Sequence, residues 1–170
     1  MRIILLILIS VIVVSLQLSV LPRFSILGVA PNLILATSIA WAIYQKDEKF
    51  SWLILIPAIL QDLLIGRPLG LITLSIWLSF SLVRWLGKFL FKQSGFIPIL
   101  FLSLIGVSSS MLFFVSLIKL VEFFNLNGAK ISWADFFYLF GPAAILYNSF
   151  LCLLVFWIIK KIFPVFNKLK

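Results

Sequence analysis

The sequence predicts an all-α fold, a bundle of six helices that crosses a lipid bilayer. Apolar residues make up 64% of the 170 positions and charged residues only 11%, whereas a soluble domain carries about 25% charged residues. The mean hydropathy is +1.24. The apolar residues fall into runs, and roughly 20 residues cross a bilayer once. The chain 1–170 therefore has room for five or six spans in a single integral membrane domain, with lipid as its main surroundings. Six spans separate the basic clusters more cleanly than five, as shown below.

The first span is predicted at 3–21 and contains only serines and Gln17 as polar breaks. It is longer than the apolar core of a signal peptide and ends at no small-x-small cleavage site, so we interpret it as a retained helix. The second span is predicted at 32–44, with the chain entering it at a slant from Phe24 onward. A Lys-Asp-Glu-Lys stretch follows and must lie outside the hydrocarbon.

The third span is predicted at 50–65 and the fourth at 69–86. Between them, Gly66, Arg67 and Pro68 predict a tight turn. Glycine commonly ends a helix and proline cannot continue one, so the chain has to reverse at this point.

The fifth span is predicted at 96–118 and the sixth at 143–159. Between them, 119–131 is the longest polar interruption of the chain. Ser132 and Asp135 then match a capping box, in which a serine and an acid three residues later bind the first free N–H groups of a helix. A basic, amphipathic tail follows the sixth span.

The basic residues divide unevenly between the two sides of such a bundle. One side holds both termini and ten basic residues: Arg2, Lys46, Lys49, Arg84, Lys88, Lys92, Lys160, Lys161, Lys168 and Lys170. The other side holds four: Arg23, Arg67, Lys119 and Lys130. The positive-inside rule therefore predicts cytoplasmic termini. The charges occur in ones and twos between apolar runs, so no nucleic-acid partner is expected.

The residue types disfavour catalysis. Histidine is absent and Cys152 is the single cysteine, which argues against a His/Cys metal site and rules out a disulfide within the chain. The acids Asp62, Glu122 and Asp135 are far apart in the sequence, whereas membrane hydrolases and transferases need clustered acids, histidines or a nucleophile beside a base. We expect a protein that is not an enzyme and needs no cofactor.

Asp62 is the acid inside an apolar run, and an intramembrane carboxylate is a candidate functional group. Four residues separate it from Gly66, so it lies about 6 Å from the helix end at 1.5 Å per residue. At that depth it can stay hydrated or pair with Arg67. We favour a structural role, in which Asp62 caps or fixes the turn from Gly66 to Gly70.

Two pairs of small residues, spaced at i and i+4, predict close helix packing. These pairs are Ala36 with Ala40, and Gly106 with Ser110. Small residues let helix backbones approach one another in membranes. Packing inside the bundle is the expected use, and packing against a partner helix is the alternative.

Two stretches carry a resemblance to a known family. A Pro-Asn-Leu motif opens the second span, and a D-x-x-x-G-x-x-L-G pattern closes the third and opens the fourth. Together they resemble the rod shape-determining protein MreD, as do the chain length, the helix count and the basic tail. The residues that carry the motifs, and are candidates for structural or partner-binding roles, are Pro31, Asn32, Asp62, Gly66, Arg67 and Gly70.

The resemblance implies a non-catalytic scaffold subunit of the bacterial elongation complex in the cytoplasmic membrane. MreC would be its main partner. It would help to couple MreB filaments to RodA and a class B penicillin-binding protein, and so to peptidoglycan synthesis and cell shape. The family also resembles the six-helix S subunits of ECF vitamin transporters, so a substrate-binding transporter subunit is the alternative. A channel would need a polar helix face lining a pore, and none of the six runs shows one.

Overall fold

The computed structural model describes residues 2–44, 55–65, 70–90, 95–124 and 141–168. Within these ranges the chain is all-helical, which confirms the predicted class. The elements in order are α1 (Arg2–Ser19), the 3-10 turn η1 (Leu21–Phe24), α2 (Leu33–Tyr44), α3 (Ile56–Ile65), α4 (Leu71–Leu90), α5 (Phe96–Phe123) and α7 (Pro142–Lys168).

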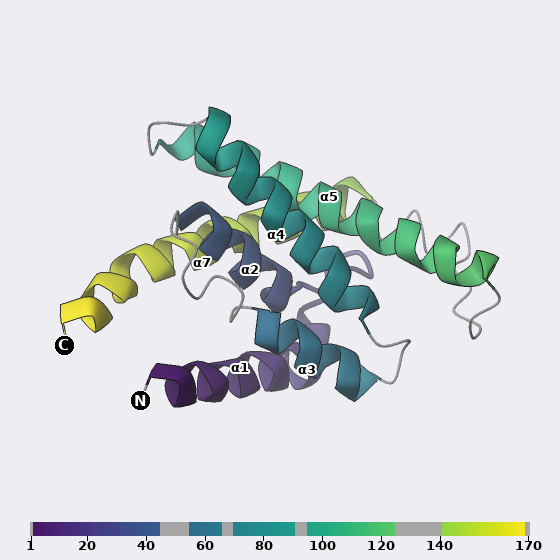
Figure 1. Cartoon of the computed structure of the whole chain (residues 1–170), viewed down its shortest axis with the longest axis horizontal. Coiled ribbons are helices and arrows are strands. Elements are labelled where there is room, and N and C mark those ends of the chain that lie inside the picture. Colours follow the sequence, from purple (N-terminus) through teal and green to yellow (C-terminus); the bar gives the residue numbers. More distant parts are fainter. Residues whose placement is uncertain (1, 45–54, 66–69, 91–94, 125–140, 169–170) are drawn as a thin grey trace.

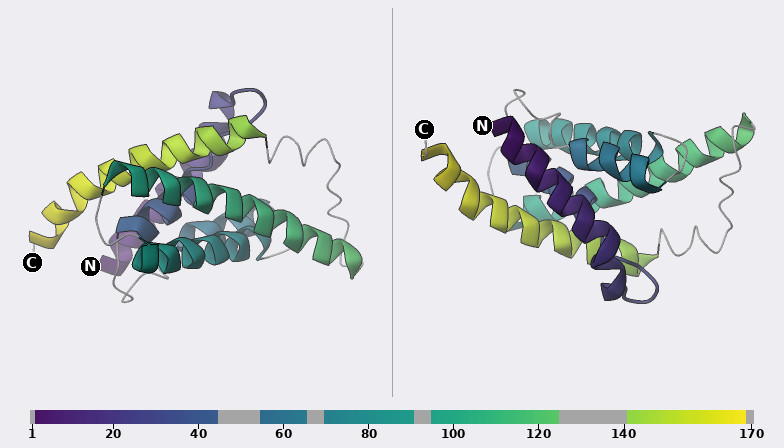
Figure 2. Two further views of the ribbon diagram at one scale, coloured as in Figure 1. Left: turned by 90° about the horizontal axis from the view of Figure 1, so that it is seen from above. Right: turned by 90° about the horizontal axis from the view of Figure 1, so that it is seen from below.

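Successive helices run in alternating directions, and both chain termini lie at the same end of the bundle (Figures 1 and 2). Helix α2 is the central element. It contacts α7, α4, α5 and α1, and none of its 12 residues is exposed. A helix buried on all sides needs an apolar surface all round rather than a stripe, and the sequence LILATSIAWAIY provides one.

Three of the helices begin with a proline in their first turn. Pro57 is the second residue of α3, Pro98 the third of α5 and Pro142 the first of α7. The first N–H groups of a helix have no partner within the helix, so a residue without an N–H is tolerated there. These prolines therefore fix helix starts within otherwise continuous apolar sequence.

The predicted slanted entry from Phe24 into the second span is wrong. After η1, the chain makes a tight turn in which the backbone groups of Ile26 and Val29 bond each other, at 3.0 and 2.9 Å. The two residues between them, Leu27 and Gly28, both have positive φ, 52° and 79°. Such a turn suits glycine or asparagine and is strained for leucine, so the chain reverses direction within the loop before α2.

Three predicted helix ends are too early. Helix α4 continues past 86 to Leu90. Helix α5 continues past 118 to Phe123, and Lys119 and Glu122 pair across one turn on its surface, Nζ to Oε2 2.7 Å. Helix α7 continues through Lys168 instead of ending at 159. Charged residues of this kind have good helix propensity, so they mark the edge of an apolar segment without ending the helix. The predicted capping box at Ser132 lies outside the described residues.

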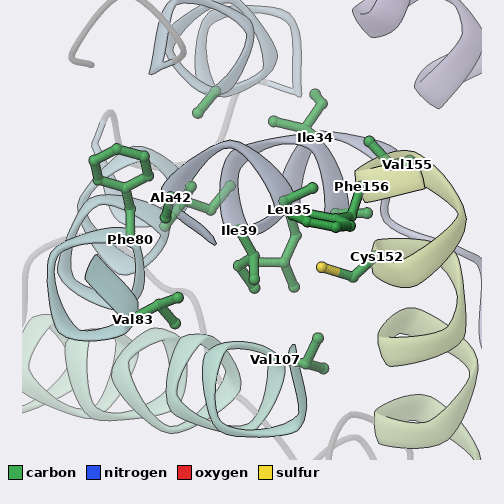
Figure 3. Close-up of a cluster of buried hydrophobic side chains, with 14 of the residues drawn as sticks. Ile34, Leu35, Ile39, Ala42, Phe80, Val83, Val107, Cys152, Val155 and Phe156 are labelled. Carbon is green, nitrogen blue, oxygen red and sulfur yellow. The ribbon is translucent and has the colours of Figure 1, made fainter. Parts of the chain in front are cut away.

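The hydrophobic core surrounds α2 (Figure 3). From α2 it includes Ile34 and Ile39, and from α4 it includes Val83, all fully buried. Gly106 of α5 faces this group, and a Cβ built on it would lie 2.8 Å from Val83 Cγ2 and 2.9 Å from Ile39 Cδ1. Separations near 3.5–4.0 Å are normal between carbon atoms. The missing side chain of Gly106 therefore lets α5 approach both α2 and α4.

Two described helices, α5 and the part of α7 up to Ile162, are long and apolar enough to cross a membrane. The described interior is notably rich in serine, because eight of its twelve buried polar residues are serines. Six of these hydroxyls donate to a carbonyl three or four residues earlier in their own helix. Such bonds satisfy the hydroxyls without water.

Candidate functional site

The motif residues that the structure describes, Pro31, Asn32, Asp62 and Gly70, lie around the N-termini of α2 and α4. Both helix starts lie at the end of the bundle away from the chain termini (Figure 1). The first N–H groups of any helix lack partners within the helix. When the helix starts inside a bundle, water does not reach them freely, so side chains have to supply the acceptors. The described residues show which side chains accept the first N–H groups of α2 and α4.

Three side chains from three parts of the chain hold the start of α2. Asn32 is its N-cap, and Asn32 Oδ1 accepts the N–H of Leu35 at 2.9 Å. Gln17 Oε1, from α1, accepts the N–H of Leu33 at 2.7 Å. Asn148 Oδ1, from α7, accepts the N–H of Asn32 itself at 2.7 Å. The Pro-Asn-Leu motif is therefore the point where α1, α2 and α7 are tied together.

The two amides that reach across to α2 are held at both of their polar atoms. Gln17 Nε2 donates to the carbonyl of Pro31 at 3.1 Å, and Asn148 Nδ2 donates to the carbonyl of Ala144 at 2.9 Å. An amide has one acceptor and one donor end, so each side chain has its orientation fixed. Both side chains are buried, and removal of either would leave a part-buried N–H at the start of α2 without its partner.

Asp62 of α3 holds the start of α4. Its Oδ1 accepts the N–H of Ile72 at 3.1 Å, and its Oδ2 accepts the N–H of Thr73 at 2.9 Å and the Thr73 hydroxyl at 2.6 Å. The side chain is almost fully buried, with 2% of the residue exposed. Three donors replace the lost water, and a helix N-terminus attracts negative charge. These contacts explain how a carboxylate is accommodated within an apolar run.

Gly70 immediately precedes α4 and has a φ of +96°. This is a conformation that residues with a side chain rarely adopt. Its carbonyl accepts the N–H of Leu74 at 2.8 Å, and open space surrounds the position of a Cβ. Glycine is therefore required here by the backbone conformation and not by crowding. Gly66 and Arg67 lie outside the described residues, so the predicted Asp62–Arg67 pair is not placed.

Some residues of this site were not singled out from the sequence. In the sequence Gln17 is only a polar break within its span, and neither Thr73 nor Asn148 belongs to a motif. Gln17 and Asn148 meet at α2 although 131 positions separate them, since 148 − 17 = 131. A weak signal did exist, because each is the single amide side chain in its apolar run, and an isolated amide in such a run needs a partner.

The small-residue pairs lie inside the bundle. Ala36 and Ala40 are fully buried on α2, and Ser110 is buried on α5. Gly106 faces Ile39 and, as described above, α4. These residues serve the packing of this chain. The alternative, that they pack against a partner helix, is wrong.

No family model, curated protein or solved structure matches the chain. The roles of Asn32 and Asp62 therefore rest on the contacts described above. In these contacts the motif side chains bind helix ends of the same chain. The carboxylate of Asp62 accepts three hydrogen bonds from α4, and the site as described stabilises helix positions.

Proposed function

We propose that this chain is a multi-pass scaffold subunit of the bacterial elongation complex, similar to MreD, with MreC as its main partner. The proposal has three parts: the chain crosses the cytoplasmic membrane six times, both termini are cytoplasmic, and the protein acts by binding other membrane helices. Each part has separate support.

The distribution of polarity supports the six crossings. Large apolar side chains are exposed on α1, α3, α4, α5 and α7, for example Leu8, Leu63, Trp77, Ile97 and Leu146. The central helix α2 is covered by its neighbours. Large apolar side chains exposed on five helices are unfavourable in water but suit contact with lipid. Together with the serine-rich interior, it favours a bundle whose outer surface faces hydrocarbon.

Helix direction and charge support the orientation. Arg84 and Lys88 lie in the last turns of α4, and Lys160 and Lys161 lie toward the end of α7. Both helices end at the side where the termini lie (Figures 1 and 2). The opposite side has Arg23 and Lys119 among its described residues. The positive-inside rule then favours cytoplasmic termini.

The observation that carries the scaffold role is the way in which the motif residues are used. Asn32 and Asp62 bind helix starts within the chain, so they support a fixed bundle rather than a bound substrate. What remains for a partner is the apolar outer surface. Membrane helices associate through close packing on such surfaces, and the single transmembrane helix of MreC is a suitable partner.

Co-purification tests the scaffold role directly. The full chain and full-length MreC are expressed together without other elongation proteins, extracted in mild detergent and purified through a tag on this chain. We expect MreC to co-purify in a fixed ratio. Absence of MreC, together with tight binding of a vitamin-sized ligand by this chain, would overturn the proposal in favour of the transporter subunit.

Cysteine labelling tests the topology independently. Cys152 is fully buried, so it provides little background for a membrane-impermeant maleimide applied to intact cells. Leu27→Cys, at an exposed position in the η1–α2 turn, should be labelled from outside. Lys161→Cys, exposed near the end of α7, should be labelled only after the membrane is opened. The reverse pattern would refute cytoplasmic termini.

A further inference from the structure

Helix α7 is longer than a membrane crossing requires. Its 27 residues span about 40 Å at 1.5 Å per residue, whereas the hydrocarbon core of a bilayer is about 30 Å thick. The first part of α7 is held in the bundle, since Asn148 binds the start of α2 and the Tyr147 hydroxyl donates to the carbonyl of Phe24 at 3.0 Å. The excess length therefore lies at the C-terminal end.

This end of α7 projects beyond α2, α4 and α5 (Figures 1 and 2, yellow). Trp157 precedes this end, with half of its surface exposed, and Lys160 Nζ lies 5.0 Å from the centroid of the Trp157 ring. Lys161 and Ile162 are also exposed. Tryptophan is enriched at the level of lipid headgroups, and an adjacent lysine can extend its ammonium toward the phosphates.

The charge of this segment is entirely positive. Helix α7 contains no acidic residue, and its last nine positions include Lys160, Lys161 and Lys168. In the sequence KKIFPVFNK, a mostly apolar stretch separates the first two lysines from the third. A basic, aromatic and apolar segment next to a membrane helix is complementary to the headgroups of anionic lipids.

We propose that the C-terminal turns of α7 bind the headgroups of anionic phospholipids on the side of the membrane where both termini lie. Trp157 sets the depth of the helix at the interface, and Lys160 and Lys161 pair with lipid phosphates. This inference rests on the membrane placement proposed above and adds a lipid partner to it. The contact would hold the end of α7 against the membrane while the first part of the helix is fixed at α2.

Lipid titration of the purified full chain tests this. Ile162→Cys carries an environment-sensitive dye, since position 162 is exposed and the native Cys152 is buried. The labelled protein in detergent is titrated with dioctanoyl phosphatidylglycerol and, separately, with dioctanoyl phosphatidylcholine. We expect at least tenfold tighter binding of phosphatidylglycerol. Combining Lys160→Gln with Lys161→Gln should weaken it roughly fivefold for each lysine.

Lys119→Gln is the matched control, because Lys119 is a lysine on α5 at the opposite end of the bundle. It should leave the preference for phosphatidylglycerol unchanged. Equal binding of the two lipids would overturn the proposal, as would an unchanged preference in the Lys160/Lys161 variant. Full competition by inorganic phosphate at matched concentration would also overturn it, because the site would then recognise any anion.

The two proposals fail separately. Loss of lipid preference with intact MreC co-purification rejects only the lipid site. Intact lipid preference without MreC co-purification rejects only the scaffold role. Size-exclusion profiles of all variants confirm that each remains folded before it is titrated.

Discussion

Replacement of Gly106 by alanine should destabilise the bundle by forcing α5 away from its neighbours. The new Cβ would lie 2.8 Å from Val83 Cγ2, and 2.9 and 3.0 Å from two carbons of Ile39. Both neighbours are fully buried and β-branched, so their side chains have little freedom to rotate away. Overpacking of a core costs about 1–3 kcal/mol. Alanine recovers about 1 kcal/mol of helix propensity, and with three short contacts we expect a net loss of about 1–2 kcal/mol.

Gly87→Ala is the matched control on α4. Its Cβ would meet only Leu102 Cδ1 at 3.7 Å, an ordinary contact distance. The same substitution should therefore stabilise the protein by about 1 kcal/mol through helix propensity alone. The two variants make the same glycine-to-alanine change and differ only in packing. The sign of the stability change therefore separates overpacking from helix propensity.

The buried thiol of Cys152 provides the assay. It is the single cysteine of the chain and is fully buried, so a thiol-reactive dye that fluoresces on reaction reports unfolding during a thermal ramp. At about 2–4 °C per kcal/mol for a chain of this size, Gly106→Ala should melt roughly 2–8 °C below the wild type. Gly87→Ala should melt roughly 2–4 °C above it. A Gly106→Ala midpoint at or above that of the wild type would refute the close approach of α5.

Four further predictions use the same thermal assay. Asp62→Leu leaves two buried N–H groups of α4 without an acceptor and should cost about 2–5 kcal/mol; a wild-type midpoint would rule out the cap. Gln17→Leu and Asn148→Leu should each cost about 1–3 kcal/mol, and because both serve the start of α2 their double variant should depart from additivity by at least about 0.5 kcal/mol. Strict additivity would mean that they act independently. Leu27→Asn removes a leucine from a positive φ and should gain about 1 kcal/mol; a lowered midpoint would contradict strain at this turn. Gly70→Ala, with open space around its Cβ, should cost about 1–3 kcal/mol from the backbone alone, and no change would show that its positive φ is not required.

The sequence was sufficient to predict the helices and insufficient to predict several of their ends. Runs of apolar residues identify helices because the period and length of such runs are local properties. Lys119 and Glu122 resemble a helix end in the sequence because they are polar, whereas the two residues pair on the helix surface. Helix ends depend on such local bonds and are less evident from composition.

The cap of α4 was partly visible in the sequence. An isolated acid near a glycine turn suggested that Asp62 fixes that turn, and the side chain does bind the helix start that follows. The hydrogen bonds from Gln17 and Asn148 to the start of α2 are not visible in the sequence, because the two residues come from the first and last described helices. Contacts between residues so distant in the chain depend on how the whole bundle packs, which no local pattern specifies.

The structural role of the motif residues changes how a partner surface has to be sought. Asn32 and Asp62 are held within the chain, so their replacement would lower MreC co-purification simply by unfolding the bundle. Under the proposed scaffold role, a residue that contacts MreC should have the opposite signature: its replacement should lower co-purification and leave the thermal midpoint unchanged. On α4, Trp77, Ser81 and Trp85 are exposed at spacings of four residues and form one outward stripe with a small residue between two large ones. Small residues allow close approach of a second helix, and the stripe bears none of the motif residues. Substitutions in this stripe can therefore test partner binding without changing the stability of the fold.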